Sequence, residues 1–243
     1  MRGAIILVST LLLAACNMAA DAQKGRSAGP GQGATTQRSF DLAGFDSVAL
    51  AGPHDVVVKV GGAHSVRAEG DPEVLDTLEI LVDGRTLEIG TKRGNWNFRN
   101  RAKTVIHVTL PAIRAASIGG SGDMRIDRAE GQEFSASIGW SGDIDVESIR
   151  VSEASFSIAG SGNIRAAGTA GQSKMSIAGS GDVDAAGLET RAANVSIVGS
   201  GAVRARAMDT ADVSIMGSGD VELTGSAKCS VSKMGSGDVR CTG

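Results

Sequence analysis

The second half of the chain repeats a ten-residue pattern seven times, and this repeat constrains the fold more than any other feature of the sequence. The pattern reads Ser-Ile-x-Gly-Ser-Gly-Asp-Val-x-Ala, and its leading serines are 20, 20, 19, 20, 18 and 18 residues apart. These serines are Ser117, Ser137, Ser157, Ser176, Ser196, Ser214 and Ser232. A regular period of this length is typical of a solenoid, in which each repeat packs against its neighbours.

One repeat already indicates strands rather than helices. In the unit that begins near Asn194, Val195 and Ile197 alternate with polar residues before Gly199-Ser200-Gly201, and the alternation resumes after it. Alternation of this kind turns one face of a strand inward, and the glycines permit a sharp corner. About 20 residues are too few for a strand and a full helix. We therefore predict an all-β fold, a right-handed parallel β-helix of about seven coils spaced about 4.8 Å apart.

The repeats predict two inward columns of aliphatic side chains, one on each side of the corner. The column before the corner contains Ile118, Ile138, Ile158, Ile177, Ile197, Ile215 and Lys233. The column after the corner contains Met124, Ile144, Ile164, Val183, Val203, Val221 and Val239. Lys233 interrupts the first column in the last coil, as expected where a terminal coil has no neighbour on one side.

A third column alternates in charge. It consists of Arg125, Asp145, Arg165, Asp184, Arg204, Glu222 and Arg240. This order predicts that the coils stack in register, with each acid between two arginines. An exposed ion pair contributes only roughly 0.2–1 kcal/mol. A slip of one coil would bring like charges together, so we interpret the column as a structural charge ladder that specifies the register.

Residues 40–116 predict a β-rich entry region ahead of the repeats at residues 117–243. A hairpin is expected around Asp83-Gly84, and a strand is expected from Val105 to Leu110. Asp71-Pro72 has the residues that begin a short helical turn, with aspartate as the cap and proline in the first position.

The first 39 residues predict export and anchoring. Residues 1–16 combine a basic start, an apolar run and the sequence Leu13-Ala14-Ala15-Cys16, which resembles a lipobox. In this interpretation Cys16 carries a lipid that holds the protein at the bacterial envelope, at the outer membrane. Ordinary cleavage after Ala20-Asp21-Ala22 is the alternative. Residues 17–39 are rich in small and polar residues and predict a flexible tether.

The cysteines bear on the redox compartment, and the net charge bears on whether the protein binds nucleic acid. Removing Cys16 from the three cysteines leaves Cys229 and Cys241, both in inward positions of the last coil. In an oxidising compartment they are candidates for a disulfide, and two buried free thiols are the alternative. The formal net charge of −3 excludes the strongly basic character of nucleic-acid-binding proteins. No cofactor is expected.

The repeated polar residues of the corner raise the question of catalysis or metal binding. The aspartate column reads Asp123, Asp143, Asn163, Asp182, Ala202, Asp220 and Asp238. A calcium ladder is one interpretation, but asparagine and alanine interrupt it, so we favour backbone hydrogen bonds that close the corners. The corner serines are expected to serve the turn as well. All three histidines lie outside the repeats, so neither a catalytic triad nor a zinc site is predicted.

Two places are candidates for ligand binding. The segment from Lys92 to Lys103 contains five basic residues, two aromatic residues and no acid, which suits an anionic glycan or lipopolysaccharide. Its candidate contact residues are Arg93, Trp96, Phe98, Arg99 and Arg101. The alternative is an edge strand whose aromatic residues face the core. Trp140 replaces a corner glycine, so its ring either projects from the corner or covers a neighbouring coil.

The entry region and the corners together resemble a known family. The matching stretches are Phe45-Asp46-Ser47-Val48, Gly52-Pro53-His54-Asp55-Val56, Leu87-Glu88-Ile89, Val108-Thr109-Leu110-Pro111 and the Gly-Ser-Gly-Asp corners. Over about residues 40–243 the sequence resembles the family "putative auto-transporter adhesin, head GIN domain". The resemblance implies a β-helical surface or periplasmic protein with an adhesive role, and it supplies no catalytic residues. Departures at Trp140, Asn163, Ala202 and Lys233 argue against a strictly repeated binding motif.

The sequence therefore predicts a non-catalytic module that is held at the membrane by its lipid and binds an envelope or host glycan or protein. A polysaccharide lyase or hydrolase built on the same scaffold is the enzymatic alternative. A structural spacer of the envelope is the third interpretation.

Overall fold

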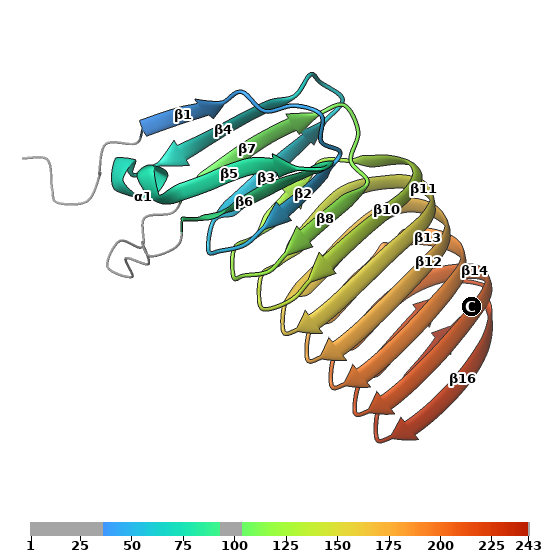
Figure 1. Cartoon of the computed structure of the whole chain (residues 1–243). Coiled ribbons are helices and arrows are strands. Elements are labelled where there is room, and N and C mark those ends of the chain that lie inside the picture. The colour runs from blue at the N-terminus through green and yellow to red at the C-terminus, as the bar shows by residue number, and fades with distance from the viewer. Residues whose placement is uncertain (1–35, 93–103, 243) are drawn as a thin grey trace, which may run out of the picture. The chain divides into compact units, whose positions relative to one another are not determined.

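The computed structural model describes residues 36–92 and 104–242, which belong to one compact unit spanning Gly33–Gly243 (Figure 1). The predicted signal peptide with Cys16 lies outside the described residues. So do the five candidate ligand-binding residues Arg93, Trp96, Phe98, Arg99 and Arg101. Within the described ranges, no helix has both the length and the apolar character needed to span a bilayer.

The described residues form one helix and seventeen strands. The entry region contains β1 (Thr36–Phe40), β2 (Ser47–Leu50), β3 (Asp55–Val60), β4 (Ser65–Gly70), α1 (Pro72–Thr77), β5 (Leu78–Asp83), β6 (Thr86–Thr91) and β7 (Val105–Leu110). The repeats contain β8 (Ala115–Ile118), β9 (Met124–Ile126), β10 (Ala129–Ile138), β11 (Ile144–Gly160), β12 (Asn163–Gly179), β13 (Asp182–Gly199), β14 (Ala202–Gly217), β15 (Asp220–Thr224), β16 (Lys228–Gly235) and β17 (Val239–Thr242).

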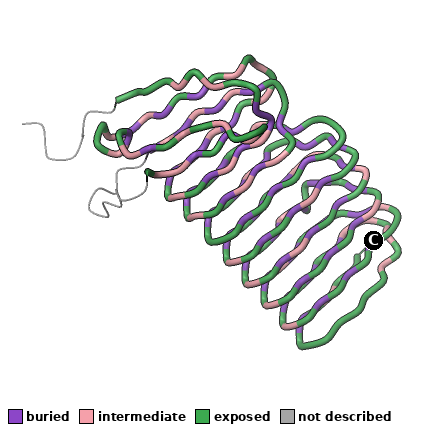
Figure 2. The backbone as a smooth tube through the Cα atoms, in the orientation of Figure 1, coloured by how far each residue is buried: buried purple, intermediate pink, exposed green. Residues whose placement is uncertain are grey.

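The repeats form an all-β solenoid of about six turns with coils of about 20 residues, which confirms the predicted fold class. Strands β8, β10, β11, β12, β13, β14 and β16 are parallel and pair in this order, so the seven corners enclose six steps of the stack. The predicted inward columns are buried from Ile118 and Met124 to Ile215 and Val221. Figure 2 shows the buried residues as purple segments that alternate with exposed green ones along the coils, whereas the last coil is almost entirely green.

Each coil turns where two consecutive residues point outward. In β11 the buried residues are Ile144, Val146, Ile149, Val151, Ala154, Phe156 and Ile158. Exposed pairs at 147–148 and 152–153 interrupt the alternation, and the corner follows at Gly160. The coil therefore has three short inward runs, each of which buries one aliphatic or aromatic wall of the core.

The corners depend on glycine for two reasons. The first corner glycine of the later coils has a positive φ of 132–151°, at Gly160, Gly179, Gly199, Gly217 and Gly235. The second glycine passes the preceding coil so closely that a Cβ on Gly142 would lie 2.1 Å from the carbonyl oxygen of Gly122. The backbone N–H groups of the corner serines donate hydrogen bonds to the preceding coil. Ser161, for example, donates to the carbonyl of Trp140 at 2.8 Å. The hydroxyls of the corner serines make no hydrogen bond within the described residues.

The aspartate column forms a hydrogen-bonded ladder between coils. Asp143 accepts the backbone N–H of Asn163 at 2.9 Å, and Asp182 accepts that of Ala202 at 2.8 Å. Ala202 has no side-chain acceptor, and the N–H of Asp220 donates instead to the carbonyl of Gly201 at 3.2 Å. The carboxylates thus have the structural role expected of them, although each one binds the next coil rather than its own corner.

The alternating charges of the charge ladder are strand-register neighbours, as the sequence predicts. Asp145, for example, lies between Arg125 and Arg165. One neighbouring pair of this column, Arg204 and Glu222, approaches within ion-pair distance, at 3.8 Å. The column therefore acts mainly through the repulsion that a shifted register would create.

The entry region contributes an additional coil to the stack. Strands β2 and β3 pair in parallel with β8 and β9, and the N–H of Ser121 donates to the carbonyl of Gly52 at 3.2 Å. Strands β6 and β7 pair in parallel with β2 and β3 on the other side. Antiparallel strands β5, β4 and β1 then complete a mixed, nearly closed sheet region. The parallel stacking of the repeats thus continues into the entry region as far as Ser47.

Local predictions for the entry region hold, with one correction. Asp71 caps α1 by accepting the N–H of Glu73 at 2.8 Å, and β5 and β6 form the hairpin expected around Asp83-Gly84. The predicted tether over residues 17–39 extends too far, because Thr36–Phe40 forms β1 and pairs with β4. This edge strand is exposed at most of its positions, so it lacks the apolar alternation that reveals a strand.

The last coil closes the C-terminal end of the stack. A disulfide joins Cys229 in β16 to Cys241 in β17. Lys233, which occupies the inward isoleucine position, donates its Nζ to the carbonyl of Gly237 at 2.6 Å. Val231 is 48% exposed although its counterparts in earlier coils are buried. The inward side of this coil is therefore largely exposed, and the disulfide and the hydrogen bond of Lys233 hold its strands in place.

We expect His54 to make the stability of the fold depend on pH. Burial lowers the pKa of His54 below its usual value of 6.5, and the charge of Asp55 opposes this only in part. The unfolded chain therefore binds the proton more readily, and stability should fall as pH decreases from 6.5 through the folded-state pKa, by at most about 1.4 kcal/mol per pH unit. Urea unfolding of wild-type and His54→Gln protein at pH 7.5 and 5 should show a smaller loss in the variant; equal losses would contradict this assignment.

Candidate functional site: the serine face and the corner ridge

The leading serines of the repeats form a straight column on the outside of one sheet. We call the outward side of β2, β8, β10, β16 and the equivalent parts of β11–β14 the serine face. Each leading serine is the register partner of the next, and the column is completed by Ala49 in β2. The alternation that buries isoleucine in each strand necessarily turns the preceding serine outward.

The hydroxyls of this column are available to a ligand. All seven leading serines are exposed or half-buried, and none makes a side-chain hydrogen bond within the described residues. The backbone beneath them is fully used by the sheet. The face therefore offers a row of groups that both donate and accept hydrogen bonds, repeated at every strand.

A second outward column lies two residues earlier in each strand. Its members are Ser47, Ala115, Ser135, Ser155, Lys174, Asn194, Asp212 and Ser230. Two shallow grooves follow this second column, and the lower one is also lined by three of the leading serines. The lower groove has a volume of about 320 Å³ and is lined by Lys174, Asn194, Asp212 and the serines of β13, β14 and β16. The upper groove has a volume of about 410 Å³ and lies over β2, β8, β10 and β11.

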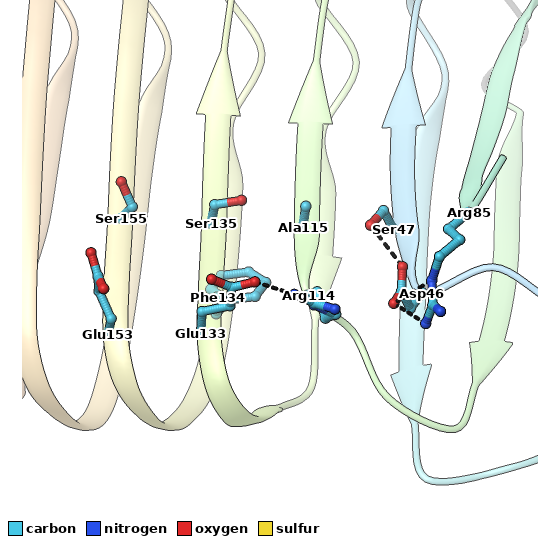
Figure 3. A pocket seen from close by; sticks show the side chains of 10 residues that line it. All are labelled: Asp46, Ser47, Arg85, Arg114, Ala115, Glu133, Phe134, Ser135, Glu153 and Ser155. Atoms are coloured by element: carbon cyan, nitrogen blue, oxygen red, sulfur yellow. Dashed lines mark hydrogen bonds and ion pairs between the residues drawn. The ribbon is translucent and has the colours of Figure 1, made fainter. Parts of the chain in front are cut away.

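Asp46 organises one wall of the upper groove (Figure 3). Its carboxylate accepts hydrogen bonds from Nε of Arg85 at 3.0 Å and from the hydroxyl of Ser47 at 3.1 Å. Its backbone carbonyl accepts a hydrogen bond from the N–H of Arg114 at 2.8 Å. Burial acts to raise the pKa of Asp46. The hydrogen bonds from Arg85 and Ser47 and the charges of both arginines outweigh it, so this pKa lies below its usual value.

The opposite wall of the upper groove carries two glutamates on neighbouring strands. Glu133 in β10 is paired with Arg114. Glu153 in β11 is the register partner of Glu133 and has no ion-pair partner within the described residues. Figure 3 shows Ser135 and Ser155 level with each other on neighbouring strands, with Glu153 next to Ser155 along β11. The groove is polar and open, and apart from Glu153 its acidic and basic groups are paired with each other.

The Gly-Ser-Gly corners form a ridge along one border of the serine face. We define the corner ridge as the two residues before each corner serine, from 119–120 to 234–235. Six large hydrophobic side chains are exposed in the described part of the chain, and four lie on this ridge. These four are Trp140 (67% exposed), Val198 (53%), Met216 (57%) and Met234 (71%). Val198, Met216 and Met234 are consecutive register partners, so they form a continuous apolar strip.

Trp140 projects from the ridge, which is one of the two arrangements anticipated from the sequence. The equivalent residue of the preceding coil, Gly120, lacks the positive φ of the later corners, but a Cβ there would lie 2.3 Å from the carbonyl oxygen of Gly52, so that coil requires glycine because of close packing. The residues at the same step in adjacent coils are glycines, Gly120 and Gly160. The indole therefore stands beside two positions that have no side chain.

Two of the histidines make contacts within the fold. His54 is buried, and Nε2 of His64 lies 2.8 Å from the carbonyl oxygen of Phe45. Within the described ranges, no three or more His, Cys, Asp or Glu side chains are placed to hold a metal ion. Of the predicted binding residues, Trp140 is the one that the structure describes. Sequence reasoning missed the leading serines as a binding surface, although their outward parity next to the buried isoleucines could have identified them.

Comparisons with known proteins agree with the fold. The family model "Putative auto-transporter adhesin, head GIN domain" matches residues 44–227. A crystal structure described as a putative adhesin from Bacteroides fragilis is 22% identical, with a TM-score of 0.77 over 86% of this chain and 96% of that one. A structure from Parabacteroides distasonis, described as a putative lipid binding protein, is 24% identical, with a TM-score of 0.70 over 87% and 98%. No curated protein matches.

Proposed function

Because the chain belongs to the family of putative auto-transporter adhesins with a head GIN domain, we propose that it is a non-catalytic adhesive module of the bacterial envelope. In this proposal the serine face and the corner ridge bind a glycan or protein of the envelope or of a host. The solenoid holds this surface rigid, because each coil is hydrogen-bonded to both neighbours along its length.

The clustering of exposed apolar side chains on the corner ridge carries the proposal. Four of the six exposed large hydrophobic residues in the described ranges lie there, beside a column of hydroxyls that have no hydrogen-bond partner among the described residues. Exposed apolar strips bordered by polar groups are typical of interaction surfaces. Methionine, which supplies two members of the strip, adapts its shape to different partners.

Anchoring is a separate part of the proposal. The apolar run that ends at Leu13-Ala14-Ala15-Cys16 supports lipidation of Cys16 and retention at the outer membrane. Export is also supported by the disulfide between Cys229 and Cys241, since such bonds persist in oxidising compartments. Fractionation of cells that express a Cys16→Ser variant tests this part, because the variant should leave the membrane fraction.

Binding of the purified protein to arrays of glycans and extracellular-matrix proteins tests the adhesive function. We expect at least one class of hit, and the triple variant Val198→Ser, Met216→Ser, Met234→Ser should weaken it by about tenfold or more, because it removes the apolar strip. Leu81→Ser is the matched control, since Leu81 is exposed but lies on β5, away from the ridge. Equal effects of the triple variant and of Leu81→Ser, or no hit on any array, would contradict the proposal.

An enzyme acting on polysaccharides is the competing function, and one observation favours it. Glu133 and Glu153 bring two carboxylates to neighbouring strands of the upper groove, and glycoside hydrolases use paired carboxylates. Both glutamates are exposed, and Glu133 is already paired with Arg114. Every glycan hit should therefore be assayed for reducing ends and unsaturated products. If wild-type protein forms product and Glu153→Gln does not, the protein is a polysaccharide-degrading enzyme and the adhesive function is wrong.

A further inference from the structure

The two grooves of the serine face lie end to end along the stack. The upper groove ends at Ser155 in β11, and the lower groove begins at Lys174 in β12, which is the register partner of Ser155. The second outward column lines both grooves and crosses eight strands, from β2 to β16, with the column of leading serines beside it; we call these two columns the track. At a strand spacing of about 4.8 Å this track is about 34 Å long. An extended ligand that runs across the strands fits it.

The track carries almost no net charge. The column of leading serines contains no charged residue, and the column beside it has one base, Lys174, and one acid, Asp212. Both arginines of the upper groove are engaged in ion pairs within the protein. Glu153 adds a carboxylate without an ion-pair partner in the described residues. Among the described residues of the track, a polyanion would find no unpaired arginine, and Glu153 would repel it.

The face is also poorly suited to a peptide. Strand addition needs an unpaired sheet edge, whereas every strand under the track from β8 to β14 already has neighbours on both sides. An amphipathic helix needs an apolar groove, and the exposed apolar side chains lie on the corner ridge beside the track. What the track offers is hydroxyls at a regular spacing and one side-chain amide, that of Asn194.

Hydroxyls that donate and accept are matched by a ligand that carries hydroxyls itself. Sugar rings also have apolar C–H faces, and the ridge provides an exposed indole at Trp140 and thioethers at Met216 and Met234 beside the serine column. We infer that the ligand is a neutral linear glycan that lies along the direction in which the coils stack, with hydroxyls on the serine columns and ring faces toward the ridge. This inference rests on the proposed adhesive function and specifies its partner.

Charge substitutions at Ser157 test the inference, because Ser157 lies in the middle of the track and is exposed. Binding of linear neutral glucans and mannans of increasing length, and of polygalacturonate of matched length, is measured by calorimetry on the purified full chain. Affinity for a neutral glycan should rise with chain length, because more contacts form on one surface. Ser157→Asp and Ser157→Lys should both weaken it by about tenfold or more, since either charge would be desolvated against an uncharged ligand.

Ser148→Asp is the matched control and should bind as wild type. Ser148 is exposed on the same strand β11, but it lies where the coil turns away from the serine face. Opposite effects of Ser157→Asp and Ser157→Lys would show that the ligand is charged and would overturn the inference. Glycan binding that is unchanged by both substitutions would also overturn it. Array hits confined to proteins would exclude a glycan and leave the adhesive function standing.

Discussion

Replacement of Gly142 by alanine is expected to lower the free energy of unfolding by about 3–5 kcal/mol, although it adds only one methyl group. The Cβ would lie 2.1 Å from the carbonyl oxygen of Gly122 and 3.0 Å from Cγ2 of Ile118. The oxygen belongs to the backbone of the neighbouring coil, so it cannot move without breaking the stack. Urea unfolding followed by circular dichroism measures the loss.

Gly139→Ala is the control, because Gly139 lies in the same corner and is equally small. Its Cβ would meet nothing nearer than the carbonyl oxygen of Ile118 at 3.7 Å. Later coils already have alanine or larger side chains at this step, as at Ala159 and Val198. We expect a change within about 0.5 kcal/mol. Similar losses for the two variants would mean that contact between coils does not explain the corner glycines.

Replacement of Phe156 by alanine is expected to destabilise the protein by about 3–5 kcal/mol. Phe156 is 1% exposed, and its register partners are Ala136 in β10 and Met175 in β12. The small alanine on one side leaves room for the ring, so its removal would leave a cavity shared by three coils. Because a solenoid is held together by interfaces between neighbours, the transition should also broaden or split as the two ends unfold separately.

Val231→Ala provides the matched comparison at the end of the same inward column. Strand register connects Phe156 to Met175, Val195, Val213 and Val231. Val231 is 48% exposed, so its truncation removes little buried surface and should cost less than about 1 kcal/mol. Thermal and urea unfolding of both variants would test the contrast. A loss at Val231 as large as at Phe156 would contradict a core that weakens toward the C-terminal coil.

The solenoid could be predicted because its evidence is local and repeated. Each unit holds its own inward residues, and the alternating signs from Arg125 to Arg240 require the coils to be neighbours in register. The extra coil formed by β2 and β3 could not be predicted in this way. Its corner reads Gly52-Pro53-His54 instead of Gly-Ser-Gly, and more than 50 residues separate β3 from its partner β9. Pairing between strands so far apart in the sequence depends on tertiary packing, which a local sequence pattern cannot predict.

The binding surface illustrates the same limit. The exposure of Trp140 could be anticipated, because a tryptophan in a corner built for glycine has no interior position to occupy. The groove beside Asp46 could not, since the ion pair with Arg85 joins residues 39 positions apart. The apolar strip from Val198 to Met234 was visible in the sequence as a single variable position. These residues form a strip only because the coils stack, which makes residues 18 positions apart in the sequence direct neighbours.

The alternating charge column also determines how a protein of this kind can change in length. Removing one coil from the middle of the stack would place two arginines or two acids side by side, as Arg125 and Arg165 would be without the coil of Asp145. Removing two adjacent coils would leave the alternation intact. The interchangeable module is therefore a pair of coils rather than a single repeat. Natural or designed relatives should grow and shrink in steps of two, and each step would lengthen or shorten the track on the serine face by the same amount.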